Sequence, residues 1–593
     1  MTLLSEASFL VTPNGYKEDK LYAAIPTNGN GDMTVTRATT ATRVNEAGLV
    51  ELVPYNLLLR SQEFDNAAWT KTATTIDATK VTAPDGSVTA QRLVPTAVTT
   101  RHFIGQPATF VSGTAYTLSV YAKADGYRYL RVGFASAAFA ILGRAASFDL
   151  QTGDVGVVQS GITTSIVNAG NGWFRCSITA TANASVTNTS NGAAFNSQPV
   201  DNALSATFTG DGTSGAQLWG AQLNEGSSAL TYQKTVDRLD IPRIDYTGGG
   251  CPSILLEPQR TNLALYSEDF NDASWDHNAN ITVTSSSELA PNGNLEANLI
   301  EYDGSGYSFI RRTTIAPSTA TLSVFAKKGN WRYLGLRNFQ TSGTHTVFDF
   351  DTETFTNIAS GQTASFEIFS NGWYRIKVTQ PSPVNNIAGF AITNSSGGEQ
   401  NSTGGQVANI HLWGAQLEAG AYATSYIPTT TASVTRNADV ISKTGISDLI
   451  GSTEGTIFCQ LQALANYSDF SRISISGANA NDKISIGYNF GNGIQAVVSV
   501  AGSLIVNFNV GGNPITNNNK IAFKYQLNSF TLFVNGVSLA TLSSGAIFSA
   551  STLTNIYFTD GDGSSYPIYG KLSSLALWKT ALTDQECINL TTL

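Results

Sequence analysis

The sequence carries few charges. Asp, Glu, Lys and Arg make up 13% of its 593 residues, about half of the ~25% that is usual in soluble domains. Basic residues number 34 against 43 acidic ones, which leaves a net charge of −9. An extended phosphate-binding surface needs clustered Lys and Arg, so this balance excludes a nucleic-acid-binding protein. No apolar run approaches the ~18–20 residues of a membrane span, which excludes a membrane-spanning protein as well.

Cysteine is also scarce. The four cysteines, at 176, 251, 459 and 587, lie far apart and include no CxxC pair. This spacing gives neither a zinc motif nor the disulfide framework of a small secreted domain. No basic residues precede the short apolar patch Phe9–Val11. We therefore expect no signal peptide and synthesis in a reducing cytoplasm.

Serine, threonine, asparagine and glycine take the place of the missing charges. Hydrophobic residues still make up 42% of the chain and aromatic residues 10%, which is enough for several ordinary cores. Abundant aromatics with few Lys and Glu are typical of many short strands joined by polar turns. At roughly 100–200 residues per domain, the chain has room for about three to five domains.

The chain contains an internal repeat. Several segments of its first half return in the same order in its second half, although the loops between them differ in length. Two copies of one domain, at 56–235 and 262–440, explain this order. The matched segments are Asn56–Phe64 with Asn262–Phe270, Ala83–Gly86 with Ala290–Gly293, Thr117–Lys123 with Thr321–Lys327, Asn171–Arg175 with Asn371–Arg375, and Leu218–Leu223 with Leu412–Leu417.

The repeated unit has the pattern of an all-β fold. In Thr117–Lys123, Leu118, Val120 and Ala122 alternate with the other residues, which is the period of two of a half-buried strand. Asn-Gly and Asp-Gly pairs separate such runs at turn positions. Neither copy has a helical stripe over about ten residues. We predict an all-β protein in which each copy is a two-sheet sandwich or jelly roll.

A different β domain follows the second copy, at 441–593. In it, Asn535-Gly536 between two alternating runs predicts a hairpin, and Thr583-Asp-Gln-Glu586 predicts the capping box of a short closing helix. Residues 236–261, with glycines and prolines, are interpreted as a linker between the copies. The first 55 residues are polar and too few for a core of their own. We expect 1–55 to form an extended arm that packs on something else.

The motifs resemble those of bacteriophage virion proteins. In that group, modules with similar motifs are described as carbohydrate-binding-like jelly rolls, and a similar lead-in precedes them. The last domain resembles laminin-G or concanavalin A-like lectin domains. The residues that carry the resemblance are Asn262–Phe270, Asn371–Arg375, Leu412–Glu418, Ala423–Thr430 and Val434–Arg436 for the module, Val35–Val44 and Gly48–Glu51 for the lead-in, and Phe533–Gly536 and Leu575–Asp584 for the lectin-like domain.

The resemblance implies a virion structural protein, made in the host bacterial cytoplasm and exposed as a tail fibre or spike. It further implies a homotrimer that docks on other virion proteins through the arm and binds host-surface polysaccharide for adsorption, with weak contacts multiplied by repetition. Nucleic acid, membrane insertion and a required cofactor are not expected. Two other functions stay open, a purely architectural head fibre or capsid decoration and a polysaccharide depolymerase.

Enzyme motifs are scarce. The four histidines have no metal-ligand spacing, and the sequence has neither HExxH nor GxSxG. Glycosidases need only two carboxylates roughly 5–10 Å apart, which the partly recurring pairs Asp149/Asp154 and Asp349/Asp351 could supply. These residues also fit strand ends and turns, where Asp is common. We predict no catalytic residues and a protein that is not an enzyme.

Two aromatic pairs are the candidate glycan-binding residues. If the leucine after each pair faces the core, Tyr127 with Tyr129, and Trp331 with Tyr333, project together from the other face of their sheets. Sugar rings stack their C–H faces on such side chains while polar neighbours bond the hydroxyls. The same rings could instead cover that face against a loop or a neighbouring subunit.

The loop Asp560-Gly-Asp-Gly-Ser564 is the candidate metal site. It places the carboxylates of Asp560 and Asp562 in a glycine-rich loop, the kind of oxygen cluster that Ca²⁺ prefers. A plain turn with solvated carboxylates has the same pattern. A structural calcium ion and a plain turn therefore both stay open.

Overall fold

A computed structural model describes residues 3–53, 56–110, 112–139, 144–202, 207–236, 239–341, 343–466 and 469–592. Nearly all of the regular structure is β-strand, so the predicted all-β class is confirmed. Among these residues no helix has the length and apolar content needed to cross a bilayer. The chain divides into two compact units, one of residues 54–238 and one that joins residues 1–53 to 239–593.

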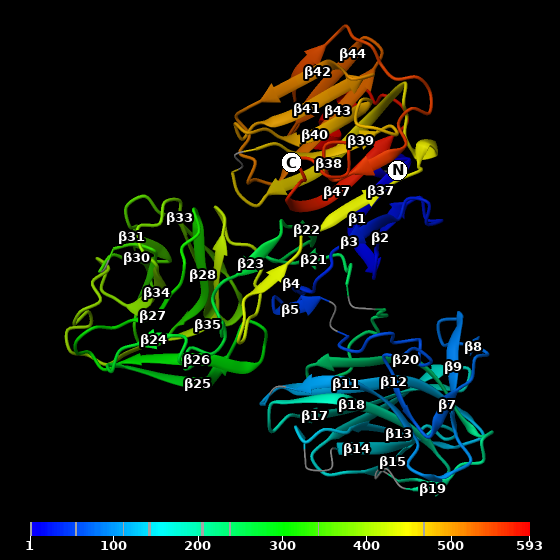
Figure 1. Ribbon diagram of the computed structural model, residues 1–593. Helices are drawn as coiled ribbons and strands as arrows, with labels where there is room; N and C mark the ends of the chain where they lie inside the picture. Colours follow the sequence, from blue (N-terminus) through cyan, green and yellow to red (C-terminus); the bar gives the residue numbers. More distant parts are fainter. Residues whose placement is uncertain are drawn as a thin grey trace. The chain divides into compact units, whose positions relative to one another are not determined.

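The unit 54–238 contains the first copy of the repeat (Figure 1). Its strands are β6 (Thr70–Thr72), β7 (Thr74–Ile76), β8 (Val81–Thr82), β9 (Val88–Pro95), β10 (Thr99–Thr100), β11 (Phe103–Phe110), β12 (Ala115–Asp125), β13 (Tyr129–Phe134), β14 (Arg144–Asp149), β15 (Val155–Val158), β16 (Thr163–Gly170), β17 (Trp173–Thr181), β18 (Val186–Gln198), β19 (Phe208–Thr209) and β20 (Gly215–Glu225). One sheet has the order β15-β14-β13-β18-β11-β6 and the other the order β16-β17-β12-β20-β9-β7. Leu118, Val120 and Ala122 of β12 are buried in the core of this unit, as their alternation predicts.

The second copy has the same topology. Its strands are β23 (Arg260–Asn262), β24 (Asp276–His277), β25 (Ile281–Leu289), β26 (Leu295–Tyr302), β27 (Ile310–Thr313), β28 (Ala320–Lys328), β29 (Tyr333–Asn338), β30 (Thr346–Asp349), β31 (Thr354–Asn357), β32 (Thr363–Ile368), β33 (Trp373–Gln380), β34 (Ile387–Ile392), β35 (Ala408–Ala419) and β36 (Val434–Arg436), with the short 3₁₀ helix η2 (Ser370–Gly372). Its sheets run β31-β30-β29-β34-β27-β24 and β32-β33-β28-β35-β26-β25, which repeats the first copy strand for strand. The matched segments of the sequence therefore fall on equivalent strands and turns.

The C-terminal domain is a further β-sandwich. Its elements are β37 (Val440–Lys443), η3 (Ser447–Leu449), β38 (Glu454–Ala463), β39 (Ser471–Ser476), β40 (Lys483–Tyr488), β41 (Ile494–Val500), β42 (Ser503–Val510), β43 (Asn519–Gln526), β44 (Ser529–Val534), β45 (Val537–Leu542), β46 (Asn555–Tyr557), β47 (Gly570–Trp578) and α1 (Asp584–Thr591). The order β42-β41-β40-β39-β46-β37 forms one group of paired strands, and β47-β38-β43-β44-β45 forms the other. Isoleucine, leucine and phenylalanine side chains from both groups share one buried core.

Two local predictions for this domain are confirmed. Asn535 and Gly536 have φ of 49° and 82° at the turn between β44 and β45, the positive values that a tight hairpin turn requires. Thr583 caps α1, and Glu586 completes the capping box.

The N-terminal residues differ from the predicted arm. They form η1 (Leu3–Glu6), β1 (Phe9–Lys17), β2 (Lys20–Ile25), β3 (Met33–Thr36), β4 (Ala41–Val44) and β5 (Val50–Val53). β1 pairs with β47, and β3 pairs with β37, so these strands join the two groups of the C-terminal sandwich (Figure 1). The physical reason is burial, because Phe9 and Val11 have no exposed surface in that core and could not be covered in a free arm.

The linker also contributes strands. β21 (Ile244–Asp245) and β22 (Ser253–Leu256) form a hairpin, and β22 continues onto β47. An equivalent hairpin, β4 with β5, precedes the first copy. The segment between the copies is thus an ordered connector that contains two short strands.

A buried ion network holds the N-terminal segment, the linker and the end of the second copy together. Arg37 Nη1 lies 2.7 Å from Asp439 Oδ1, and Arg243 bonds both Asp439 and Glu257. Arg436 Nη1 lies 2.6 Å from Glu257 Oε2. Burial acts to raise the pKa of Asp439, but Arg243 and Arg37 outweigh it and hold that pKa below its usual value.

Candidate functional site

The aromatic pair of the second copy lies at one end of β29. Trp331 and Tyr333 are half-buried, and their ring centroids lie 6.4 Å apart in an edge-on arrangement. Trp331 Nε1 donates to the carbonyl of Thr393 at 2.8 Å. The guanidinium of Arg332 lies 5.0 Å from the Tyr333 ring centroid and pairs with Asp349. The pair is accessible in part, and glycan binding by these residues stays a prediction.

The corresponding pair of the first copy is less accessible. Tyr127 is only 9% exposed, because Phe208 of β19 packs against its ring at 5.9 Å between centroids. Tyr127 thus covers its face of the sheet against another segment, which is the alternative that the sequence leaves open, and glycan binding by this pair stays a prediction. Tyr129 is half-buried, and the Arg128 guanidinium lies 5.4 Å from its ring centroid.

Three of the four partly recurring carboxylates, Asp149, Asp349 and Asp351, form ion pairs. Asp149 pairs with Arg128, and a hydrogen bond from that guanidinium lowers the pKa of Asp149. Asp351 lies 2.5 Å from Lys328 Nζ. Both Asp149 and Asp351 therefore have a basic partner in the fold.

The two candidate calcium ligands have different surroundings. Asp560 is buried, and its Oδ2 lies 2.7 Å from Arg472 Nη1 and 2.9 Å from Lys483 Nζ. Asp562 is exposed and accepts hydrogen bonds from the backbone N–H groups of Ser564 and Ser565, as in a turn. Within the described ranges, no group of three or more His, Cys, Asp or Glu side chains is placed to hold a metal ion. Calcium at this loop stays a prediction.

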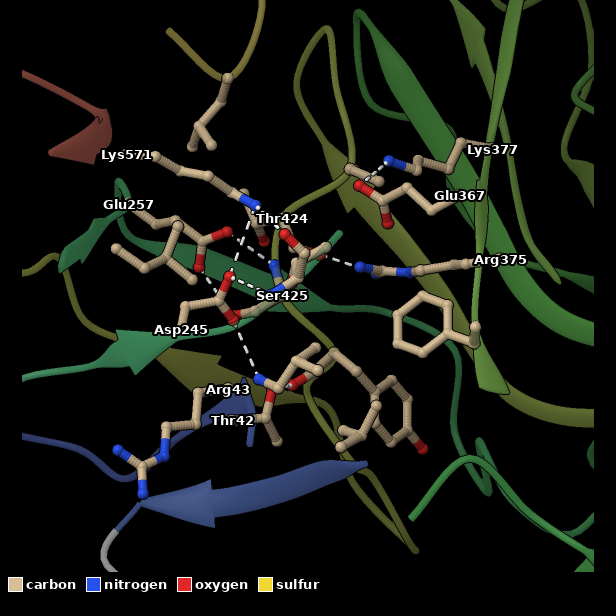
Figure 2. A pocket seen from close by; sticks show the side chains of 18 of the residues that line it. Thr42, Arg43, Asp245, Glu257, Glu367, Arg375, Lys377, Thr424, Ser425 and Lys571 are labelled. Atoms are coloured by element: carbon tan, nitrogen blue, oxygen red, sulfur yellow. Dashed lines mark hydrogen bonds and ion pairs between the residues drawn. The ribbon is translucent and has the colours of Figure 1, made fainter. Parts of the chain in front are cut away.

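A cavity of about 90 Å³ lies where the hairpin β4–β5 meets the second copy (Figure 2). It is rich in charged and hydroxyl side chains. Those labelled in Figure 2 are Thr42, Arg43, Asp245, Glu257, Glu367, Arg375, Lys377, Thr424, Ser425 and Lys571.

Several charged side chains that line the cavity form ion pairs with one another. Lys377 Nζ lies 2.7 Å from Glu367 Oε1, and Lys571 Nζ lies 3.4 Å from Asp245 Oδ2 (Figure 2). Burial acts to raise the pKa of Glu367, but Lys377 outweighs it, and the pKa is lowered. The pKa of Glu257 is lowered in the same way by Arg436 and Arg243 against the effect of burial. A general acid for sugar cleavage needs a raised pKa, so neither glutamate is suited to that task.

His345 and Glu399 form a buried titratable pair in the second copy. His345 Nε2 lies 3.6 Å from Glu399 Oε2, and Nδ1 faces the carbonyl of Gly397 at 3.1 Å. Burial lowers the pKa of His345 from 6.5 to about 4, and burial raises the pKa of Glu399. The fold therefore favours a neutral imidazole.

We predict that His345 makes the second copy sensitive to mild acid. Between pH 6.5 and about 4 the unfolded imidazole binds a proton and the folded one does not, so stability falls as the pH is lowered. At about 1.4 kcal/mol for each pKa unit, the loss approaches ~3 kcal/mol near pH 4. In urea unfolding, His345→Asn should flatten this decline, because asparagine can still donate to Gly397 but does not titrate. Equal slopes for wild type and variant would contradict the prediction, and unfolding of the unit 54–238 serves as the internal control.

A third aromatic group, absent from the sequence predictions, lies at one end of β39 and β40. We call Phe470, Phe490, Tyr566 and Arg472 the rim cluster. The centroid of Phe470 lies 5.5 Å from that of Phe490 and 5.3 Å from that of Tyr566. Arg472 is buried beneath the Phe470 ring, at 4.4 Å from its centroid. Phe490 is 67% exposed and Tyr566 is 39% exposed, so the cluster presents aromatic surface to solvent.

The rim cluster is hard to find in the sequence because its rings come from three loops. The available signal is Phe490 itself, which stands in the turn sequence Asn489-Phe490-Gly491. A large ring in such a polar turn has no neighbouring core to enter.

The comparisons with known proteins concern the C-terminal domain. Residues 451–587 match the family described as the concanavalin A-like lectin/glucanases superfamily. No curated protein matches the chain. The lectin-like character expected for this domain is therefore supported, and the rim cluster lies within the matched residues.

Solved structures match the chain at low overall similarity. A Ruminococcus gnavus IT-sialidase CBM40 bound to α2,3-sialyllactose is 18% identical, with 25% of this chain and 91% of that chain covered and a TM-score of 0.22. Domain 4 of AbnA, a GH43 extracellular arabinanase from Geobacillus stearothermophilus in complex with arabinotriose, is 12% identical, with 28% and 81% covered and a TM-score of 0.22. What this chain is similar to, over residues 451–587, is the superfamily of concanavalin A-like lectins and glucanases.

Proposed function

We propose that the chain is a non-enzymatic structural protein of a bacteriophage virion that binds host-surface glycans. The observation that carries the carbohydrate-binding part is the match of residues 451–587 to the concanavalin A-like lectin/glucanases superfamily. The phage part comes from the resemblance of the repeated motifs and of the lead-in at 35–51.

The proposed role places the chain on the outside of the particle as a tail fibre or spike. Three β-sandwiches in one chain, and three chains in a homotrimer, would multiply weak glycan contacts into useful avidity. The N-terminal strands β1 and β3 complete the C-terminal sandwich, so their paired edges are already occupied within the chain. Docking on other virion proteins would then use surfaces beyond these paired strands.

An architectural head fibre or capsid decoration is the second candidate. The covered ring of Tyr127 favours it, because a buried ring offers little surface to a glycan. A polysaccharide depolymerase is the third, and it requires a carboxylic acid that donates a proton.

Glycan binding by the purified full-length chain tests these functions together. The fibre function predicts binding on a glycan array and inhibition of phage adsorption when the free protein is added to host cells. An architectural protein would give no array signal, and a depolymerase would release reducing ends from host polysaccharide. Electron microscopy of virions with a labelled C-terminus would assign the protein to the tail or the head.

A further inference from the structure

The rim cluster continues into a row of polar side chains across β39 to β42. Strand pairing places Arg472 opposite Gly487, Gly487 opposite Gln495, and Gln495 opposite Asn509. Side chains that face each other across paired strands lie on the same side of the sheet. Because Gly487 has no side chain, Arg472 reaches across β40, and its Nη2 donates to Oε1 of Gln495 at 2.6 Å.

Hydrogen bonds hold the amides of this row in place. Gln495 Nε2 donates to Oδ1 of Asn507 at 3.0 Å and to Oδ1 of Asn509 at 2.9 Å. Asn489, next to Phe490, donates from Nδ2 to Oδ1 of Asn509 at 3.0 Å. Asn507 and Asn509 are exposed, so oriented amide groups stand beside exposed aromatic rings.

Two cations beneath the row, Arg472 and Lys483, share the single carboxylate of Asp560, and all three side chains are largely buried. Asp560 accepts from Arg472, from Lys483 and, at 2.7 Å, from the hydroxyl of Ser485. Within the part of the chain that the structure describes, neither cation of this group is left without a carboxylate. The surface therefore offers rings and amides, which suit an uncharged ligand better than an acidic one.

We infer that the rim cluster and the amide row bind a neutral glycan. The apolar C–H face of one sugar ring stacks on Phe490, and its hydroxyl groups bond Asn507 and Asn509. Tyr566 contributes a second ring and a hydroxyl group at the other side of Phe470. This inference rests on the proposed glycan-binding function and specifies the site and the sugar class.

The test compares full-length variants on immobilised neutral glucans and galactans and on sialylated and uronic-acid-containing glycans. Phe490→Ala should weaken binding to a neutral glycan about tenfold, which is the scale of one lost stacking contact. Asn507→Ala should also weaken it, by several-fold. Leu527→Ala is the matched control, because Leu527 is 61% exposed in the same domain and lies outside the rim cluster. Thermal unfolding of each variant verifies that the fold is retained.

Each outcome has a distinct meaning. Weaker binding by Phe490→Ala and Asn507→Ala, with Leu527→Ala equal to wild type, supports the site. Neutral glycan binding that both variants leave unchanged overturns the site but leaves the proposed function standing. Binding confined to acidic glycans overturns the sugar class. Absence of any glycan binding by the wild type overturns the proposed function, and this inference with it.

Discussion

Replacing Asp439 with alanine should lower the free energy of unfolding of its unit by about 3–5 kcal/mol. The side chain is 3% exposed and pairs with Arg37 and Arg243, whose side chains have no exposed surface. Removal of the carboxylate leaves two buried guanidinium groups with less compensating charge, and a buried charge without its partner is costly. Urea unfolding at pH 7 measures the loss.

A surface ion pair in the same unit is the control. Asp276 lies 2.9 Å from Arg311, and its side chain is 62% exposed. Asp276→Ala should cost at most ~1 kcal/mol, because water screens and replaces the lost contact. If Asp439→Ala were as mild as this control, the buried network would contribute little to joining the N-terminal segment to the rest of its unit.

The network also explains a sequence feature whose role the sequence alone does not reveal. The residues Val-Thr-Arg occur at 35–37 and again at 434–436. In the structure both arginines enter the same network, Arg37 through Asp439 and Arg436 through Glu257. These positions are some 400 residues apart in the sequence, so only the folded chain shows that they act together.

Much of the fold could be predicted because its signals are local. Alternation in Thr117–Lys123 predicts β12, and Asn535-Gly536 predicts the β44–β45 hairpin, since each pattern is contained within one element or one turn. The internal repeat extends this prediction, because a sequence pattern that identifies a strand in one copy also identifies the equivalent strand in the other copy.

The N-terminal strands and the rim cluster could not be predicted because their partners are distant in sequence. Phe9 pairs with Leu577, and nothing near Phe9 indicates that a sheet edge is available to cover it. The rings at 470, 490 and 566 likewise meet only after three loops are brought to one end of a sheet. Tyr127 shows a second limit. Alternation predicts the face of the sheet on which Tyr127 lies, but it does not predict that Phe208 of the distant strand β19 covers its ring.

Alanine at Trp69 or at Trp275 should destabilise one unit of the chain and leave the other unchanged. Both indoles are 2% exposed, and each Nε1 donates to a backbone carbonyl, that of Arg60 at 3.0 Å and that of Tyr266 at 3.1 Å. Their neighbours also correspond, with ring centroids 5.0 Å from Phe64 in one copy and 5.1 Å from Phe270 in the other. Removing a buried indole leaves a large cavity and an unpaired carbonyl, so we expect each variant to lose about 3–5 kcal/mol.

Calorimetry distinguishes the two effects. Trp69→Ala should shift only the transition of the unit 54–238, and Trp275→Ala only that of the unit that contains the second copy, because each unit buries its own hydrophobic core. The double variant should show both shifts at their single-variant sizes, since the two indoles share no partner. A single transition that moves with either substitution would instead mean that the two units unfold as one cooperative body.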